Sequence, residues 1–302
     1  MKRNSVLLSL PPYMMLGFFL GLLFGDPTGE SATISMLALG FMMTFSMSEM
    51  VFEFSRGEGT FREWVAPVLL SFGLATPVLL AMGFLFGGDL GMGWMLVASV
   101  PAAIAIVPYS ERMRGNMRIA LHGEIAIYLL ALALTPAIAV ITLGANVDVF
   151  ELLKTLLLLI LIPMGLSRIV RRLKLGAKTK GMATNLAFMV FFMVVVGANR
   201  GIFFGEPMTV LALAVASFAA VFIIGHLVDF SLRNKPTGDR RVLTMFSALK
   251  NTGLAIAVAL SLGIDEMALP ATMLLIIEMV WAVYLFAWKY KEKSFDLKMQ
   301  PY

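Results

Sequence analysis

Hydrophobic positions in this chain form long continuous blocks rather than an alternating pattern. Ten apolar blocks are separated by short segments rich in Gly, Pro, Asp and Asn. A block of about 20 apolar residues crosses the hydrocarbon core as an α-helix, whereas a membrane β-barrel would alternate. The pattern predicts an all-α integral membrane protein with ten spans: Val6–Gly25, Ser31–Phe52, Trp64–Phe86, Gly91–Tyr109, Ile119–Leu143, Val149–Ile169, Met182–Phe204, Thr209–Phe230, Val242–Gly263 and Ala268–Trp288.

Basic residues occur in every second connection. Of the 24 Lys and Arg residues, 21 lie at the N-terminus, at the C-terminus or between spans two and three, four and five, six and seven, or eight and nine. Because basic connections stay in the cytoplasm, both termini are predicted to be cytoplasmic. The first block has no small-residue cleavage pattern after it, so it is interpreted as a retained span rather than a signal peptide.

Ten spans divide into two halves of five, residues 1–146 and 147–302. An odd number of spans per half inserts the halves in opposite orientations, which predicts an inverted repeat in one integral membrane unit. Pro12 and Pro163 are 151 residues apart, and Glu124 and Glu278 are 154 apart. Pro101 and the Lys250–Asn251 pair, which interrupt spans four and nine, are about 149 apart.

These two interruptions carry the candidate chemistry. Pro101 removes a backbone donor within span four, and Lys250, Asn251, Thr252 and Gly253 form a polar patch within span nine. Lys250 follows Arg241 by nine residues, about 13.5 Å along a helix and near the centre of the bilayer. Two broken helices crossing there, one per half, would direct free N–H groups at a bound anion.

The candidate site therefore combines six residues at the breaks with three titratable residues. Substrate contacts are expected at Pro101, Ala102, Ala103, Lys250, Asn251 and Thr252, and proton coupling at Glu124, His122 or Glu278. A lysine in the centre of a span needs a partner, for which Glu124 and Glu278 are the candidates. A simple proline kink, a structural Glu278 and an interfacial His122 remain open alternatives.

Composition agrees with a membrane protein and narrows the function. The chain has 302 residues, 59% apolar and 14% charged, with a mean hydropathy of +0.87. The net charge of +5 does not indicate nucleic acid, because the basic residues lie in short loops. Without cysteine there is no disulfide or thiolate metal site, and we expect no metal site and no cofactor. No nucleophile has a base at the same depth, so an enzyme or sensor is disfavoured.

Three stretches resemble the bile acid:sodium symporter family. They are LALGFMMTFSMSEMVFEF in span two, the region ASVPAAIAIVPYS to LALALTP in spans four and five, and FSALKNTGLAIAVALSLG in span nine. Pro101, Asn251 and the Leu254–Ala255 pair carry most of the similarity. The resemblance implies a ten-span fold with a substrate site where the broken helices cross.

The chain departs from that family where sodium-coupled members have oxygen ligands. Phe246 and Lys250 stand at the Glu and Gln positions of the ninth-span motif, and Ile106 and Val107 at the Ser-Asn of span four. The span-five hydroxyl positions correspond to about His122 and Ala126. A hard cation such as Na⁺ requires oxygen ligands, so the sequence predicts that Lys250 supplies a fixed positive charge in place of sodium.

The leading hypothesis is a secondary transporter of a small organic carboxylate in the cell membrane. Na⁺ or H⁺ would be the coupling ion, with sodium coupling disfavoured, and uncoupled transport is also compatible. Its expected partners are the substrate and the lipid bilayer, in a monomer or homodimer, without nucleic acid. The alternative is a cation/proton antiporter of related crossed-helix fold that uses Lys250 and Glu124.

Overall fold

The computed structural model describes residues 10–26, 28–49, 60–144, 148–173, 175–285 and 289, and in these ranges it is all-α. The ends of predicted spans one, two and ten, and the basic residues Lys2, Arg3, Arg56, Lys174, Lys291, Lys293 and Lys298, lie outside them. In chain order the helices are α1 (Leu10–Phe24), α2 (Ser31–Glu49), α3 (Phe61–Val68), η1 (Leu69–Ala75), α4 (Thr76–Phe86), α5 (Gly88–Ser99), α6 (Ile106–Arg112), α7 (Met117–Leu143), α8 (Val149–Arg172), α9 (Ala177–Ala198), α10 (Arg200–Gly205), α11 (Pro207–Phe218), η3 (Ala219–Ile223), α12 (Ile224–Ser231), α13 (Thr237–Ala248), α14 (Thr252–Ser261), η4 (Asp265–Ala268) and α15 (Leu269–Tyr284).

Seven helical segments of the described chain are long and apolar enough to cross a membrane, as expected for a multi-pass membrane protein. They are Ser31–Ser48, Phe61–Phe86, Met117–Leu143, Leu153–Arg172, Lys178–Ala198, Pro207–Ser231 and Asp265–Tyr284. Three of the ten predicted spans are missing from this set for two reasons. The described apolar part of the first, Pro12–Phe24, is short, and the fourth and ninth are each divided into two short helices.

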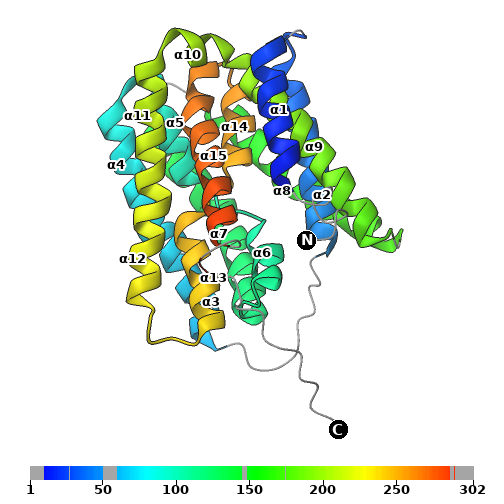
Figure 1. Ribbon diagram of the computed structural model, residues 1–302, viewed down its shortest axis with the longest axis vertical. Helices are drawn as coiled ribbons and strands as arrows, with labels where there is room; N and C mark the ends of the chain where they lie inside the picture. Colours follow the sequence, from blue (N-terminus) through cyan, green and yellow to red (C-terminus); the bar gives the residue numbers. More distant parts are fainter. Residues whose placement is uncertain are drawn as a thin grey trace.

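The helices pack as two groups (Figure 1). The first group contains α1, α2, α8 and α9. Helices α1 and α9 approach closely at Gly17 and Gly21 of α1, where an added Cβ atom would lie 2.5 Å from the carbonyl oxygens of Met189 and Met193 in α9. The second group contains α3 to α7 and α11 to α15, and its helix α14 also packs against α2 and α8 of the first group. These two groups are the framework that positions the site.

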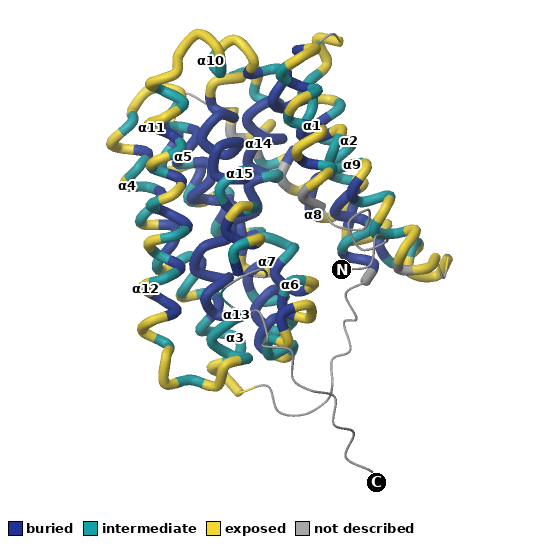
Figure 2. Tube along the Cα trace, viewed as in Figure 1, coloured by how far each residue is buried: buried dark blue, intermediate teal, exposed yellow. Residues whose placement is uncertain are grey.

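The outer surface is apolar, as a lipid environment requires. Leu85 and Ile141 are 83% and 80% exposed, and exposed positions line the outward faces of the outer helices in Figure 2. Helix α14 is instead almost entirely buried, and most of α15 is buried as well. Exposed apolar side chains on a whole helical bundle are costly in water but stable against lipid chains.

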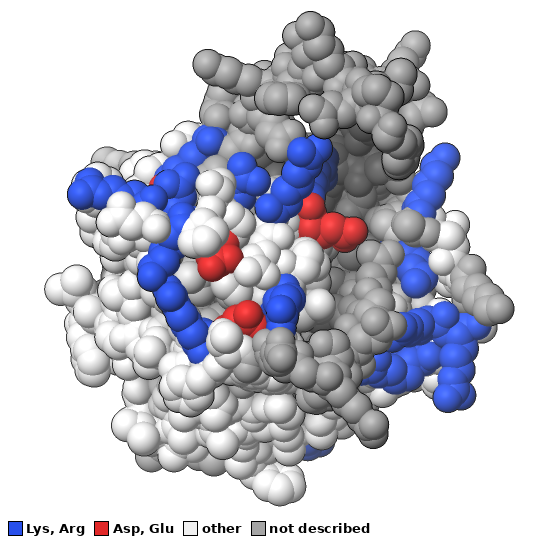
Figure 3. All heavy atoms as spheres, turned by 90° about the horizontal axis from the view of Figure 1, so that it is seen from below, with Lys and Arg blue, Asp and Glu red and all other residues white. Residues whose placement is uncertain are grey.

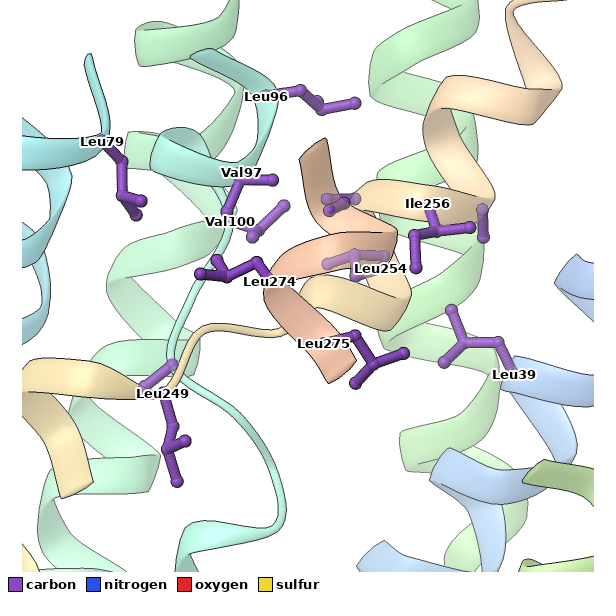
Figure 4. Close-up of a cluster of buried hydrophobic side chains, with 14 of the residues drawn as sticks. Leu39, Leu79, Leu96, Val97, Val100, Leu249, Leu254, Ile256, Leu274 and Leu275 are labelled. Carbon is purple, nitrogen blue, oxygen red and sulfur yellow. The ribbon is translucent and has the colours of Figure 1, made fainter. Parts of the chain in front are cut away.

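The predicted interruptions of spans four and nine are confirmed. Helix α5 ends at Ser99 and α6 begins at Ile106, while α13 ends at Ala248 and α14 begins at Thr252. The two open segments run antiparallel, with a bridge between Ala102 and Lys250. Apolar side chains from α5, α14 and α15 surround them (Figure 4).

Hydrogen bonds between the two segments replace those that the breaks remove. The Asn251 N–H donates to the Pro101 carbonyl at 2.8 Å, and the Ala103 N–H donates to the Leu249 carbonyl at 3.2 Å. Buried backbone groups need such partners because no water is available to them. The breaks are therefore mutually dependent, since each supplies the partners that the other needs.

Two of the long segments contain a π-helical turn, which the sequence analysis did not predict. Phe61–Phe86 includes η1, and Pro207–Ser231 includes η3. A π-helical turn inserts a residue into the helical repeat and often accompanies a functional site. Helix α13, which leads into the second break, packs against both π-helical turns.

Candidate functional site

A cavity of about 310 Å³ lies where the two helical groups meet at the paired breaks. The first group contributes side chains such as Met43 of α2 and Phe188 of α9, and the second contributes both open segments and α15. Among the predicted site residues, Ala103, Lys250, Asn251, Thr252 and Glu278 line this cavity. The cavity is mainly apolar, with polar groups concentrated at the second break and near Arg112.

Pro101 and Ala102 act on the cavity through the backbone. Pro101 supplies the carbonyl that accepts from Asn251, and Ala102 forms the bridge with Lys250. Ala102 is fully buried, and neither residue is among those that line the cavity. They shape the site through the backbone, while Ala103 lines the cavity itself.

Asn251 holds the start of α14 and links it to α7. Its Oδ1 atom accepts from the Leu254 N–H at 3.1 Å, as an N-cap residue does. Its Nδ2 group donates to the Tyr128 hydroxyl at 2.9 Å. The amide orientation is thus determined on both sides, and Asn251 connects the cavity to the fifth predicted span.

Glu278 binds the second break by two hydrogen bonds. Its Oε1 atom accepts from the Lys250 backbone N–H at 2.8 Å, and its Oε2 atom accepts from the Thr252 hydroxyl at 3.2 Å. Glu278 therefore contacts Lys250, as expected for a candidate partner, but through the backbone rather than the ammonium group. This geometry favours the structural alternative for Glu278.

The Lys250 side chain is 1% exposed, and its ammonium group makes one hydrogen bond and one cation–π contact. Its ammonium group donates to the Thr76 hydroxyl at 3.2 Å and lies 4.8 Å from the centre of the Phe72 ring. Thr76 in turn donates to the Ala98 carbonyl at 2.7 Å. No carboxylate of the described residues forms an ion pair with this ammonium group.

Glu124 lies in a second, smaller cavity of about 80 Å³. It is 4% exposed, and neither carboxylate oxygen has a hydrogen-bond partner within the described part of the chain. The expected pairing of Glu124 with Lys250 is therefore wrong for this structure. Sequence gives the depth of each residue along its helix, but it does not say which sides of two helices face each other.

His122 contacts neither Glu124 nor Lys250. Its Nδ1 atom lies 3.1 Å from a carboxylate oxygen of Glu63, and its ring stacks on Trp64 with ring centres 4.6 Å apart. Arg118 also approaches Glu63, at 3.9 Å. This cluster joins α3 to α7 near the N-terminal ends of both helices. Such a position agrees with the alternative interpretation of His122 as an interfacial residue.

Several cavity residues were not predicted as part of the site. Ser46, Thr184 and Asn185 line the cavity. The only sequence feature that could have identified them is that they are polar residues within apolar spans. Arg112 was assigned only to a basic connection, yet it lines the cavity while remaining exposed. The cavity therefore reaches the surface at the end of the molecule where α6 ends.

The described residues contain no group of three or more His, Cys, Asp or Glu side chains able to hold a metal ion. Neither the protein-family models nor the curated proteins compared with the chain give a match.

Proposed function

We propose that this protein is a secondary transporter that carries a small organic anion, with a carboxylate group, across the cell membrane. The observation that carries the proposal is the 310 Å³ cavity at the paired breaks, lined by side chains from both helical groups. A pocket of this volume suits a small ligand, and a mainly apolar lining with a few convergent polar groups is typical of such sites.

The polar groups favour an anion. The start of α14 and the Arg112 guanidinium group are positive groups at this cavity, while the donors of Asn251 and Thr252 are bound to Tyr128 and Glu278. The start of a helix and a guanidinium group both attract a carboxylate. The apolar remainder of the lining suits the carbon skeleton of the same ligand.

In this proposal the chain has ten spans in two inverted halves, with the breaks near the bilayer centre. The π-helical turns support the repeat, because their central residues, Phe72 and Val221, are 149 residues apart. The bridged residues Ala102 and Lys250 are 148 apart. Equivalent irregularities at nearly equal offsets are what two copies of one five-span unit would contain.

The distribution of basic residues supports cytoplasmic termini. Figure 3 looks onto one end of the molecule, where many Lys and Arg side chains gather and a few Asp and Glu side chains lie beside them. The connections α6–α7 and α12–α13, with Arg114 and Arg233, lie at this end in Figure 1. If this end is cytoplasmic, the cavity near Arg112 opens inward, and rocking of one helical group against the other would expose it outward.

The resemblance to bile acid:sodium symporters is consistent with this proposal. In this chain the fixed ammonium group of Lys250 would replace the sodium ion, so that sodium coupling is unnecessary. The antiporter alternative relied on a Lys250–Glu124 pair, and no observation now favours it. The proposed oligomeric states remain a monomer or homodimer.

The test is uptake of radiolabelled small carboxylates by purified protein in proteoliposomes, with and without a sodium or pH gradient. We expect saturable uptake of at least one compound without sodium. Ala103→Trp fills the cavity and should abolish this uptake, whereas Ala133→Trp, at an exposed position of α7, should not. Absence of flux and of thermal stabilisation across a broad carboxylate panel would overturn the proposal.

A further inference from the structure

We propose that Glu124 is a proton-binding residue outside the anion cavity, linked to that cavity through Tyr128 and Asn251. The smaller cavity lies between α7, α2 and α8, beside Ile104 of the α5–α6 connection. Its lining is apolar except for Glu124 and Tyr128. Both carboxylate oxygens are buried and without a hydrogen-bond partner among the described residues.

An ionised carboxylate in this position would lack compensation for the water it has lost. A metal ion is a poor solution, because hard cations need several oxygen ligands and the lining offers one carboxylate and one hydroxyl. An organic cation would find one carboxylate, one hydroxyl and otherwise apolar side chains in this lining, so the loss of its hydration would be poorly compensated. A proton needs no further ligand, so it is the occupant that the cavity fits.

No other charge lines this cavity to hold Glu124 ionised. Facing residues of the packed elements are apolar: Met47 of α2, and Ile160, Leu161 and Met164 of α8. None of the other charged groups described on the surrounding elements is in this lining. Among them are Glu63 of α3 with His122 and Arg118, Arg112 of α6 at the anion cavity with Tyr109, Arg168 of α8 one turn beyond Met164, and Arg241 of α13 at the Met113 carbonyl.

One hydrogen bond, between Tyr128 and Asn251, joins the lining of this cavity to that of the anion site. Glu124 and Tyr128 are four residues apart, on one face of α7, and the Tyr128 oxygen accepts from Asn251, the N-cap of α14. When Glu124 is neutral it does not require the Tyr128 proton. When it is ionised, its carboxylate becomes an acceptor for that hydroxyl, directly or through one water molecule. The hydroxyl oxygen still accepts from Asn251, and donating its own proton makes it a stronger acceptor, which strengthens the bond to Asn251.

The coupling part of this inference rests on the proposed function. One proton from the aqueous phase on one side is already bound to a carboxylate oxygen of Glu124 when the anion binds, and it leaves to the opposite side as the anion leaves. Carriage of one proton with one monocarboxylate moves no net charge. A pH gradient would then drive accumulation without sodium.

Infrared spectroscopy tests the proton site without any substrate. Protonated carboxylic acids absorb at a frequency separate from carboxylates, so the difference between wild type and Glu124→Gln isolates this residue. At neutral pH we expect a protonated-acid band that disappears as the pH is raised, and no such band from the exposed Glu151→Gln control. A carboxylate band at neutral pH, with or without a bound alkylammonium ion, would overturn the inference.

Transport then tests the coupling. In Glu124→Gln, accumulation driven by a pH gradient should be lost while exchange of labelled for unlabelled anion continues. Tyr128→Phe should keep the infrared band and reduce the proton-driven accumulation. This second variant tests the coupling even if Glu124→Gln does not fold. Wild type that exchanges anion without any pH dependence would contradict the coupling. If wild type has no flux but shows the band, the proposed function fails while the proton site stands.

Discussion

Lys250 illustrates how a buried charge is accommodated without a carboxylate. A lone ammonium group in the centre of a membrane helix costs about 2.5–3.5 kcal/mol on insertion scales. The face of Phe72 offsets part of that cost. Thr76 supplies an acceptor and donates to Ala98, in the last turn of α5. The positive charge thus lies close to the end of a helix whose carbonyl groups carry partial negative charge.

Lys250→Met should separate a transport role from a folding role. The variant removes the charge but keeps the shape, and Thr76 retains its bond to Ala98, so thermal stability should be unchanged or higher. Anion uptake should fall by about tenfold or more, equivalent to about 1.4 kcal/mol of lost attraction. The matched control is Lys154→Met, an exposed lysine paired with Glu151, which should leave both quantities unchanged. Uptake at the wild-type rate in Lys250→Met would exclude an electrostatic role.

The sequence identified Pro101, Lys250 and Asn251 because each interrupts an otherwise apolar helix at a definite depth. It did not identify the partners. Thr76 and Phe72 belong to another predicted span, and nothing in their neighbourhood distinguishes them from packing residues. Which side chains of two helices contact each other depends on the rotation of each helix and on the order of the helices around the centre. The spacing of residues within one span predicts neither property.

At the scale of helices, breaks and π-helical turns differ in how well sequence predicts them. A proline or a polar cluster in an apolar block disrupts the helix by a mechanism visible in the sequence. The stretch LLSFGLA of η1 has the composition of any apolar helix, and its π-helical form depends on tertiary packing, including that of α13. Helix boundaries at breaks were therefore predictable, while the irregular turns in the long helices were not.

Gly123 determines how closely α7 approaches its neighbours. A Cβ atom there would lie 2.5 Å from Pro67 Cγ in α3 and 2.9 Å from Phe246 Cζ in α13. Gly123→Ala should therefore destabilise the protein by about 1–3 kcal/mol through overpacking. Gly165→Ala is the matched control, because no atom lies within 4 Å of its added Cβ, and it should stabilise by about 0.5–1 kcal/mol through helix propensity. Equilibrium unfolding of both variants in the same detergent measures the contrast, and equal stabilities would contradict this packing argument.

At the scale of the whole molecule, all-α membrane architecture followed directly from the apolar blocks. The division into two packed groups did not, because α1 and α2 belong with α8 and α9, far from them in the sequence. That division places the cavity between groups rather than within one. A site between two bodies can open to alternate sides by their relative motion, whereas a site within one rigid body cannot.

The rocking motion predicts that a covalent link across the cavity stops transport. Phe188 of α9 and Met279 of α15 line the cavity from opposite groups, and the chain has no cysteine of its own. The double variant Phe188→Cys/Met279→Cys, joined by thiol reagents of increasing length that reduction can remove, should lose uptake with short linkers and recover it after reduction.

Two controls distinguish restricted motion from simple blockage. A monofunctional thiol reagent on the same pair adds similar bulk without a link and should preserve more uptake than the bifunctional one. The pair Phe18→Cys/Phe192→Cys joins α1 to α9 within the first group, where the two native rings have centres 6.2 Å apart. Linking it should leave uptake unchanged, because these helices move together. Full uptake with the Phe188–Met279 link intact would show that the two groups need not separate, and the cavity would then have to open by local helix movement.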